Sequence, residues 1–152
     1  MRTVRDESGD VYLLLKRSDE SSLVRDPRSG EETYLDNDRL ELAADDAVLE
    51  TAALAVPSAV RRVLTAVPNE RALGLLVALD DRGPLPVREL LDATDLCESD
   101  LHGLLAEFRA AGLLEERRVA GERGYATTDA AADALASLTR SSDASGGQDD
   151  AP

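Results

Sequence analysis

The succession of helical and extended patterns between Asn69 and Leu138 constrains this chain more than any other feature of its sequence. Apolar residues recur there at intervals of three and four, which is the spacing of one helix face, and in places the pattern changes to that of a strand. Three helices are predicted first, with core residues Leu73, Leu75, Leu76 and Leu79, then Val87, Leu90 and Leu91, then Leu101, Leu104, Leu105 and Phe108. Two strands within 113–119 and 124–127 follow, and then a helix from Asp129 to Leu138 anchored by Leu135 and Leu138.

Capping and turn residues define the ends of these elements. Asn69 is a favourable N-cap, and Gly83 and Pro84 follow the first helix. Leu85 makes a brief extended segment, Pro86 opens the second helix, and 93–95 is a turn. The third helix covers 98–111, residues 120–123 form a hairpin turn, and Thr128 caps the last helix. A winged helix-turn-helix domain has this order of elements: helix, short strand, helix, turn, helix, hairpin and helix.

The residues of this region also resemble known regulators. The turn at 93–96, the stretch 109–114 and the later 125–129 match the helix-turn-helix of the ArsR and MarR families. The whole chain resembles small winged-helix proteins of haloarchaea. The resemblance implies a winged helix-turn-helix at 68–140, with a DNA-recognition helix at about 98–111 and a wing at about 113–127. It is more specific for the fold than for the function.

The first 44 residues have the pattern of short strands. Apolar runs at 11–15, 23–24, 33–35 and 40–42 alternate with polar stretches, and residues 26–30 form a turn. Three or four antiparallel strands are predicted, and so small a sheet needs another element to pack against. The fold class is therefore α+β, with a small antiparallel β module (1–44) and a linker helix preceding the winged helix-turn-helix domain.

Residues 45–67 are predicted to link the two parts as helices. Val48, Leu49, Ala52 and Val56 recur at helical spacing, and Pro57 begins a second stripe of Val60, Val63, Leu64 and Val67. This segment either docks the β module onto the C-terminal domain or forms a dimerisation helix. Residues 141–152, rich in Ser, Gly and Asp, are predicted to form a disordered acidic tail.

The charge of the chain is strongly negative. It has 31 acidic and 17 basic residues, a formal net charge of −14, and Lys16 is its single lysine. Acidic residues are distributed along the whole chain, as in a halophilic archaeal protein, where dense carboxylates maintain solubility and concentrated salt screens their repulsion. In such salt an acidic protein is not excluded from binding nucleic acid.

Several classes of function have no support in the sequence. One cysteine, Cys97, and one histidine, His102, exclude an internal disulfide framework and a cysteine-based zinc site within one protomer. Neither a phosphate loop nor a nucleophile elbow is present, so we expect no enzyme activity and no cofactor. The absence of a long apolar run and of a signal-peptide pattern predicts a cytoplasmic protein without membrane contact.

The start of the third helix supplies the candidates for reading base edges. A helix in the major groove presents its N-terminal residues to the bases, which here are Glu98, Ser99, His102 and Gly103. Glu98 can accept from cytosine amino groups and Ser99 can bond several edges. The alternative for Glu98 is a favourable interaction with the helix dipole, and that for His102 is a solvated surface side chain.

Five arginines are the candidates for backbone contacts. Arg117, Arg118 and Arg123 flank the predicted wing, while Arg88 and Arg109 lie on the second and third helices. The alternative is that they balance nearby acids, because residues 96–124 contain six acids and four arginines.

Two functions from different classes remain. The first is a homodimeric transcription regulator that binds double-stranded DNA. The second is an adaptor that kept the winged-helix scaffold, lost DNA readout and binds a basic protein partner.

Overall fold

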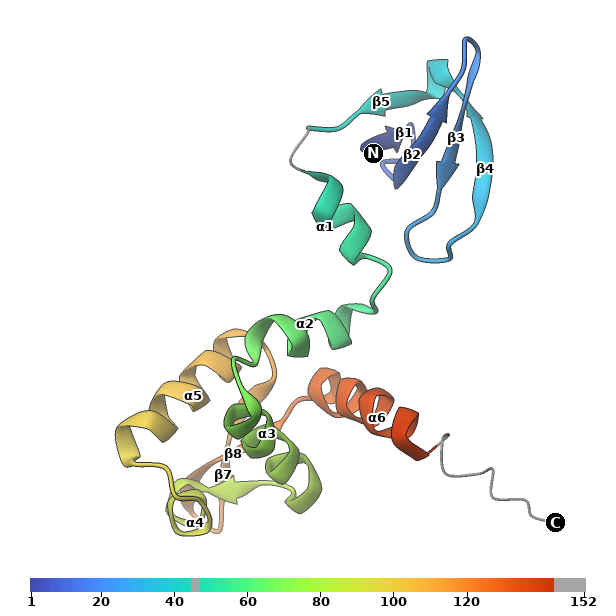
Figure 1. Ribbon diagram of the computed structural model, residues 1–152. Helices are drawn as coiled ribbons and strands as arrows, with labels where there is room; N and C mark the ends of the chain where they lie inside the picture. The colour runs from blue at the N-terminus through green and yellow to red at the C-terminus, as the bar shows by residue number, and fades with distance from the viewer. Residues whose placement is uncertain (45–46, 144–152) are drawn as a thin grey trace, which may run out of the picture. The chain divides into compact units, whose positions relative to one another are not determined.

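The computed structural model describes residues 1–44 and 47–143, and the chain divides into two compact units, Met1–Ser58 and a second unit from Ala59 onward (Figure 1). Each unit combines helices with an antiparallel sheet, so the predicted mixture of α and β elements is confirmed. The part of the predicted acidic tail from residue 144 lies outside the described residues.

A five-stranded antiparallel sheet forms the main part of the first unit, with strand order β4-β3-β2-β1-β5. Its strands are β1 (Arg2–Asp6), β2 (Val11–Arg17), β3 (Ser21–Arg25), β4 (Glu32–Asp36) and β5 (Leu40–Leu42). The 3-10 helix η1 (Asn37–Arg39) connects the last two. Asp26 starts the predicted turn before β4, where its carboxylate accepts from the Arg28 N–H at 2.8 Å.

The prediction of three or four strands was too low because β1 was missed. This strand contains a single large apolar residue, Val4, so its alternation is weak in the sequence. Val4 is nevertheless buried, and so is Thr3, whose hydroxyl donates a hydrogen bond of 3.0 Å to the Thr51 hydroxyl of helix α1 (Val48–Ala53). A polar residue buried through a partner 48 positions away leaves no local pattern.

Helix α1 is shorter than the apolar spacing predicted. It ends at Ala53, so Val56 lies outside it, as expected for a residue that precedes proline and is disfavoured in helical conformation. Leu49, predicted on the apolar stripe, is 80% exposed. Helix α2 (Ser58–Ala66) follows Pro57, and α2 lies in the second unit apart from its first residue.

The second unit has the element order predicted from the sequence. It comprises α2, α3 (Glu70–Arg82), β6 (Leu85–Pro86), α4 (Val87–Ala93), α5 (Glu98–Ala110), β7 (Leu114–Val119), β8 (Glu122–Thr127) and α6 (Asp129–Asp143). The strands form an antiparallel sheet of order β6-β8-β7. Helix α6 extends to Asp143 and is therefore longer than the predicted helix, which ended at Leu138. The prediction stopped there because Ser and Thr residues replace the alanines beyond that point.

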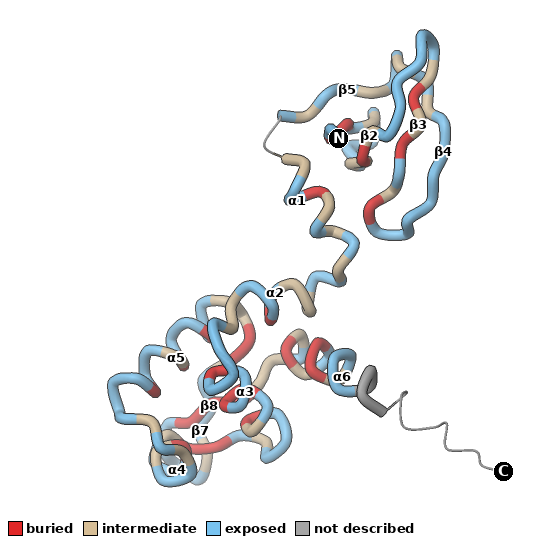
Figure 2. The backbone as a smooth tube through the Cα atoms, in the orientation of Figure 1, coloured by how far each residue is buried: buried red, intermediate tan, exposed pale blue. Residues whose placement is uncertain are grey.

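One hydrophobic core holds this second unit together. Figure 2 shows that buried residues of this core lie in α3, in the strands and in the first turns of α6. The largest side chains that are fully buried there are those of Phe108, Leu76, Leu79, Leu90, Leu101, Leu105, Leu113 and Val63. Val87, Leu91 and Leu104, predicted as buried, are only partly buried at the edge of this core. The N-cap predicted for α3 is confirmed, because the Asn69 side chain accepts from the Ala72 N–H at 3.0 Å.

Three leucines on the predicted apolar stripes are exposed, and two of them, Leu73 and Leu138, had been expected to pack in the core. Leu64 of α2, Leu73 of α3 and Leu138 of α6 are 60%, 37% and 39% exposed. All three border one largely apolar hollow of about 470 Å³, which Val63 and Val67 also line. Helical spacing identified an apolar face correctly but did not show which residues on that face a neighbour would cover.

The β7–β8 hairpin has a tighter turn than predicted. Val119 pairs with Glu122, so the turn consists of Ala120 and Gly121 alone, and Glu122 and Arg123 belong to β8. Both turn residues have positive φ, 51° and 82°, as a two-residue hairpin turn matching the strand twist requires. The turn residue Ala120 gave no signal for this in the sequence, because alanine rarely adopts that conformation.

Replacing Gly124 by alanine is expected to destabilise the second unit by about 1–3 kcal/mol, the usual cost of overpacking. Gly124 is buried where β8 pairs with β6, and an added Cβ would lie 2.5 Å from the Leu85 carbonyl oxygen. Backbone cannot yield as a flexible side chain does, so the strands must separate. Chemical denaturation measures the loss. An unchanged midpoint would contradict the close approach of β6 to β8.

Candidate nucleic-acid interface

Helix α5 divides into a buried face and an exposed face. Leu101, Leu105 and Phe108 are buried, which fixes the rotation of the helix. At 100° per residue, the opposite face consists of Ser99, Gly103, Ala106 and Ala110, all of them exposed. We call these four residues the α5 ridge. Because its side chains are small, another surface can approach the helix backbone closely along the ridge.

Gly103 lies in the middle of the α5 ridge and faces open space. Apart from its chain neighbours and the nearby backbone of α5 itself, a Cβ added at this position would have no atom of the described residues within 4 Å. Nothing in the packing of the unit therefore requires glycine here. The helix also gains nothing from it, since glycine in an exposed helix interior is less favourable than alanine.

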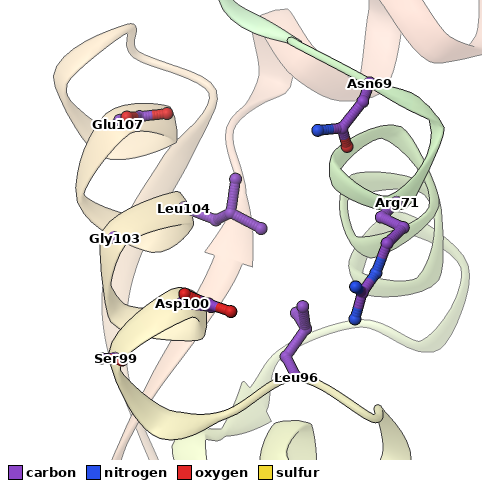
Figure 3. A pocket seen from close by; sticks show the side chains of 8 residues that line it. All are labelled: Asn69, Arg71, Leu96, Ser99, Asp100, Gly103, Leu104 and Glu107. Carbon is purple, nitrogen blue, oxygen red and sulfur yellow. The ribbon is translucent and has the colours of Figure 1, made fainter.

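The two sides of the ridge carry different groups. Glu98, His102 and Arg109 lie on the side facing the hairpin, where His102 Nε2 is 3.7 Å from the Glu98 carboxylate. Asp100 and Glu107 lie on the other side, along a hollow of about 320 Å³ between α5 and the start of α3. Figure 3 shows Asp100 and the Arg71 guanidinium directed into this hollow. Arg71 pairs with Asp95 at 3.2 Å.

The hairpin carries three exposed arginines around a second hollow. Arg117, Arg118 and Arg123 line it together with Glu116, and its volume is about 300 Å³. Arg118 donates to the Gly121 carbonyl at 3.2 Å and so lies back over the turn. Arg117 pairs with Glu115 at 2.9 Å on its own strand.

Glu116 connects two arginines from different elements in one polar network. Its Oε1 accepts from Arg123 Nε at 2.7 Å and lies 3.5 Å from Arg109 Nη1. Arg123 also donates to the Tyr125 hydroxyl at 3.0 Å, and its guanidinium carbon lies 5.8 Å from the Tyr125 ring centroid. The hydrogen bond to Glu116, followed by the effect of Tyr125, raises the pKa of Arg123 above its usual value.

Arg88 joins α4 to the hairpin. Its Nη2 lies 3.3 Å from the Glu122 carboxylate, and this hydrogen bond raises the pKa of Arg88. Four of the five candidate arginines are thus paired with a hairpin glutamate, and the fifth, Arg118, with a backbone carbonyl. The arginine surface is therefore interrupted by carboxylates and is not a continuous basic stripe.

All nine residues predicted as DNA-contacting are exposed in the second unit. They fall into three places: Glu98, Ser99, His102, Gly103 and Arg109 on α5, Arg88 on α4, and Arg117, Arg118 and Arg123 on the hairpin. The ion pairs of Arg109 and Arg88 connect α5 and α4 to the hairpin. Sequence reasoning missed Ala106 and Ala110, which helical spacing from Ser99 and Gly103 could have identified. It also missed Glu116 as the shared partner of two arginines.

Among residues 1–44 and 47–143, no group of three or more His, Cys, Asp or Glu side chains is arranged to hold a metal ion. Within the same ranges no helix has the length and apolarity needed to cross a membrane. Cys97 is exposed, and its sulfur lies 3.4 Å from the Ser99 hydroxyl.

A family model described as "Family of unknown function (DUF7346)" matches residues 1–139. No curated protein matches the sequence. Among solved structures, the chain is similar to HlyU from Vibrio cholerae N16961, with 31% identity over 55% of this chain and 90% of that chain and a TM-score of 0.47. It is similar to the transcriptional regulator HlyU from Vibrio vulnificus CMCP6, with 29% identity over 63% and 93% of the chains and a TM-score of 0.47. An ArsR family transcriptional regulator is similar at 18% identity over 61% and 96%, with a TM-score of 0.42.

Proposed function

We propose that the second unit of this chain, which belongs to the family of unknown function DUF7346, is a winged helix-turn-helix. In this proposal the unit binds double-stranded DNA as a transcription regulator. The observation that carries the proposal is the exposed α5 ridge beside an arginine-bearing hairpin. In this proposal α4 and α5 are the helix-turn-helix, and the β7–β8 hairpin is the wing.

Helix α5 enters the major groove with its ridge toward the bases. The small ridge residues allow the helix to lie deep in the groove, which is wide enough for an α-helix. Ser99 and His102 then supply hydrogen-bonding groups to base edges, and Glu98 supplies an acceptor for a cytosine amino group. Arg88, Arg109, Arg117, Arg118 and Arg123 contact phosphates, which set the register of the protein on the duplex without specifying sequence.

Gly103→Ala is expected to move stability and DNA binding in opposite directions. The helix gains about 0.5–1 kcal/mol, because alanine replaces glycine where no neighbouring atom is displaced. DNA affinity is expected to fall about 5- to 100-fold, since an added methyl group overpacks a closely fitted interface. Thermal denaturation and fluorescence anisotropy on a selected duplex measure the two effects. A rise in stability with unchanged DNA affinity would show that Gly103 does not lie in the interface.

A homodimer is part of the proposal. The apolar hollow bordered by the exposed Leu64, Leu73 and Leu138 supports it, because monomers seldom leave adjoining apolar side chains uncovered. Two-fold symmetry would then match a palindromic DNA site. Light scattering at working concentration tests this part, and a monomer mass would refute it.

The net charge of −14 supports a protein adapted to concentrated salt, as in halophilic archaea.

An adaptor that binds a basic protein is the second candidate function. The specific observation in its favour is the pairing of Arg88, Arg109, Arg117 and Arg123 with hairpin glutamates. A surface neutralised in this way lacks the basic stripe of ordinary DNA-binding domains. Purification of the tagged protein at matched salt separates the candidates: recovery of one protein partner without enriched DNA favours the adaptor.

A further inference from the structure

Glu116 forms ion pairs with two arginines and so affects which other anions these arginines can bind. Its carboxylate, on β7, contacts Arg109 from α5 and Arg123 from β8, at 3.5 and 2.7 Å. All three side chains are partly or largely exposed, so the network lies at the surface between the helix and the hairpin. One carboxylate thus occupies two cations on the proposed DNA-binding surface.

Carboxylates and phosphates compete for the same donors. Both accept from a guanidinium through paired oxygens in the same plane. A phosphate can therefore use the Arg109 and Arg123 donors that face Glu116 only when it displaces Glu116. Arg123 keeps its hydrogen bond to the Tyr125 hydroxyl and its position near the ring, so its guanidinium remains oriented when Glu116 leaves.

We propose that Glu116 is an internal competitor of DNA phosphate, which lowers the affinity of this surface for DNA and flattens the dependence of that affinity on salt. This inference rests on the proposed function, because it concerns the regulation of the same site. An arginine that binds phosphate normally causes release of a cation from the DNA. Glu116, once displaced, attracts a cation in its turn and cancels part of that release.

The test compares the full-length protein with its Glu116→Gln variant on a labelled duplex of random sequence. Anisotropy is measured over a tenfold salt range in which circular dichroism shows both proteins folded. The variant is expected to bind more tightly at the lowest salt, with a log–log slope steeper by about one to two, at about 0.9 per phosphate contact regained. The ratio of the two Kd values then changes about 10- to 100-fold across the range.

Two further variants make the outcome decisive. Glu20→Gln changes the net charge equally but lies exposed in the first unit, and it is expected to leave the slope unchanged. Glu116→Ala removes the charge without introducing an amide, so it must reproduce the steeper slope. Parallel lines for wild type and both Glu116 variants would overturn the inference and leave DNA binding intact. Absence of DNA binding by every protein would instead overturn the proposed function, and the inference with it.

Discussion

Replacing Arg117 and Arg118 together by alanine is expected to weaken DNA binding about 10- to 100-fold, by a similar factor on every sequence. Both side chains lie on β7 beside the hairpin turn and border the same hollow. Phosphate contacts carry no base information, so their loss reduces specific and non-specific binding alike. The log–log slope of affinity against salt should become shallower by about one to two, since each lost contact contributes at most about 0.9 and Glu115 offsets part of the contribution of Arg117.

The matched control is Arg5→Ala with Arg28→Ala, which removes two exposed arginines of the first unit. It changes the net charge by the same amount and is expected to leave both affinity and slope nearly unchanged. Titration of each variant against a selected duplex and a random one gives the four affinities needed. Equal losses for the wing pair and the control pair would mean that total charge, and not the wing, determines binding.

Phe108→Ala is expected to destabilise the second unit by about 3–5 kcal/mol, which is a large fraction of the stability of an ordinary small domain. The ring is fully buried, and Phe108 lies in the core that α3, α5 and α6 share with the sheet. Its carbonyl also accepts from the Leu113 N–H at 2.8 Å, where the chain leaves α5. Removing the ring leaves a cavity that the surrounding leucines can fill only in part.

Urea denaturation followed by helical circular dichroism measures this loss. Val77→Ala serves as the control, because Val77 lies on α3 in the same unit and is 40% exposed. We expect it to change stability by no more than about 0.5 kcal/mol, as surface substitutions do. If Phe108→Ala were as mild as Val77→Ala, the single core described for this unit would be wrong.

Much of the second unit could be predicted because its local signals and its packing agree. The spacing of Leu101, Leu105 and Phe108 located both α5 and its buried face, and Asn69 marked the start of α3 through a hydrogen bond that depends on neighbouring residues alone. The first unit was less predictable. Strand β1 forms a local hairpin with β2, but its pairing with β5 and the Thr3–Thr51 hydrogen bond are contacts between distant residues.

The candidate site divides in the same way. Spacing along one helix brought Ser99 and Gly103 to the same face, and the exposure of both was predictable from the burial of Leu101 and Leu105. The pairing of arginines with glutamates was anticipated only as a balance of charge. The particular pairs, such as Arg88 with Glu122 across 34 positions, depend on the register of the hairpin and on its distance from the helices.

Binding of this protein to specific DNA sites is tested by genome-wide recovery of DNA with the tagged protein. Cells and buffers are kept at the salt concentration in which the protein works. We expect sharp peaks that share one sequence motif, with a palindrome if the protein is a dimer. A flat profile from well-expressed, folded protein would contradict this expectation, and the proteins recovered alongside would then identify the partner of an adaptor.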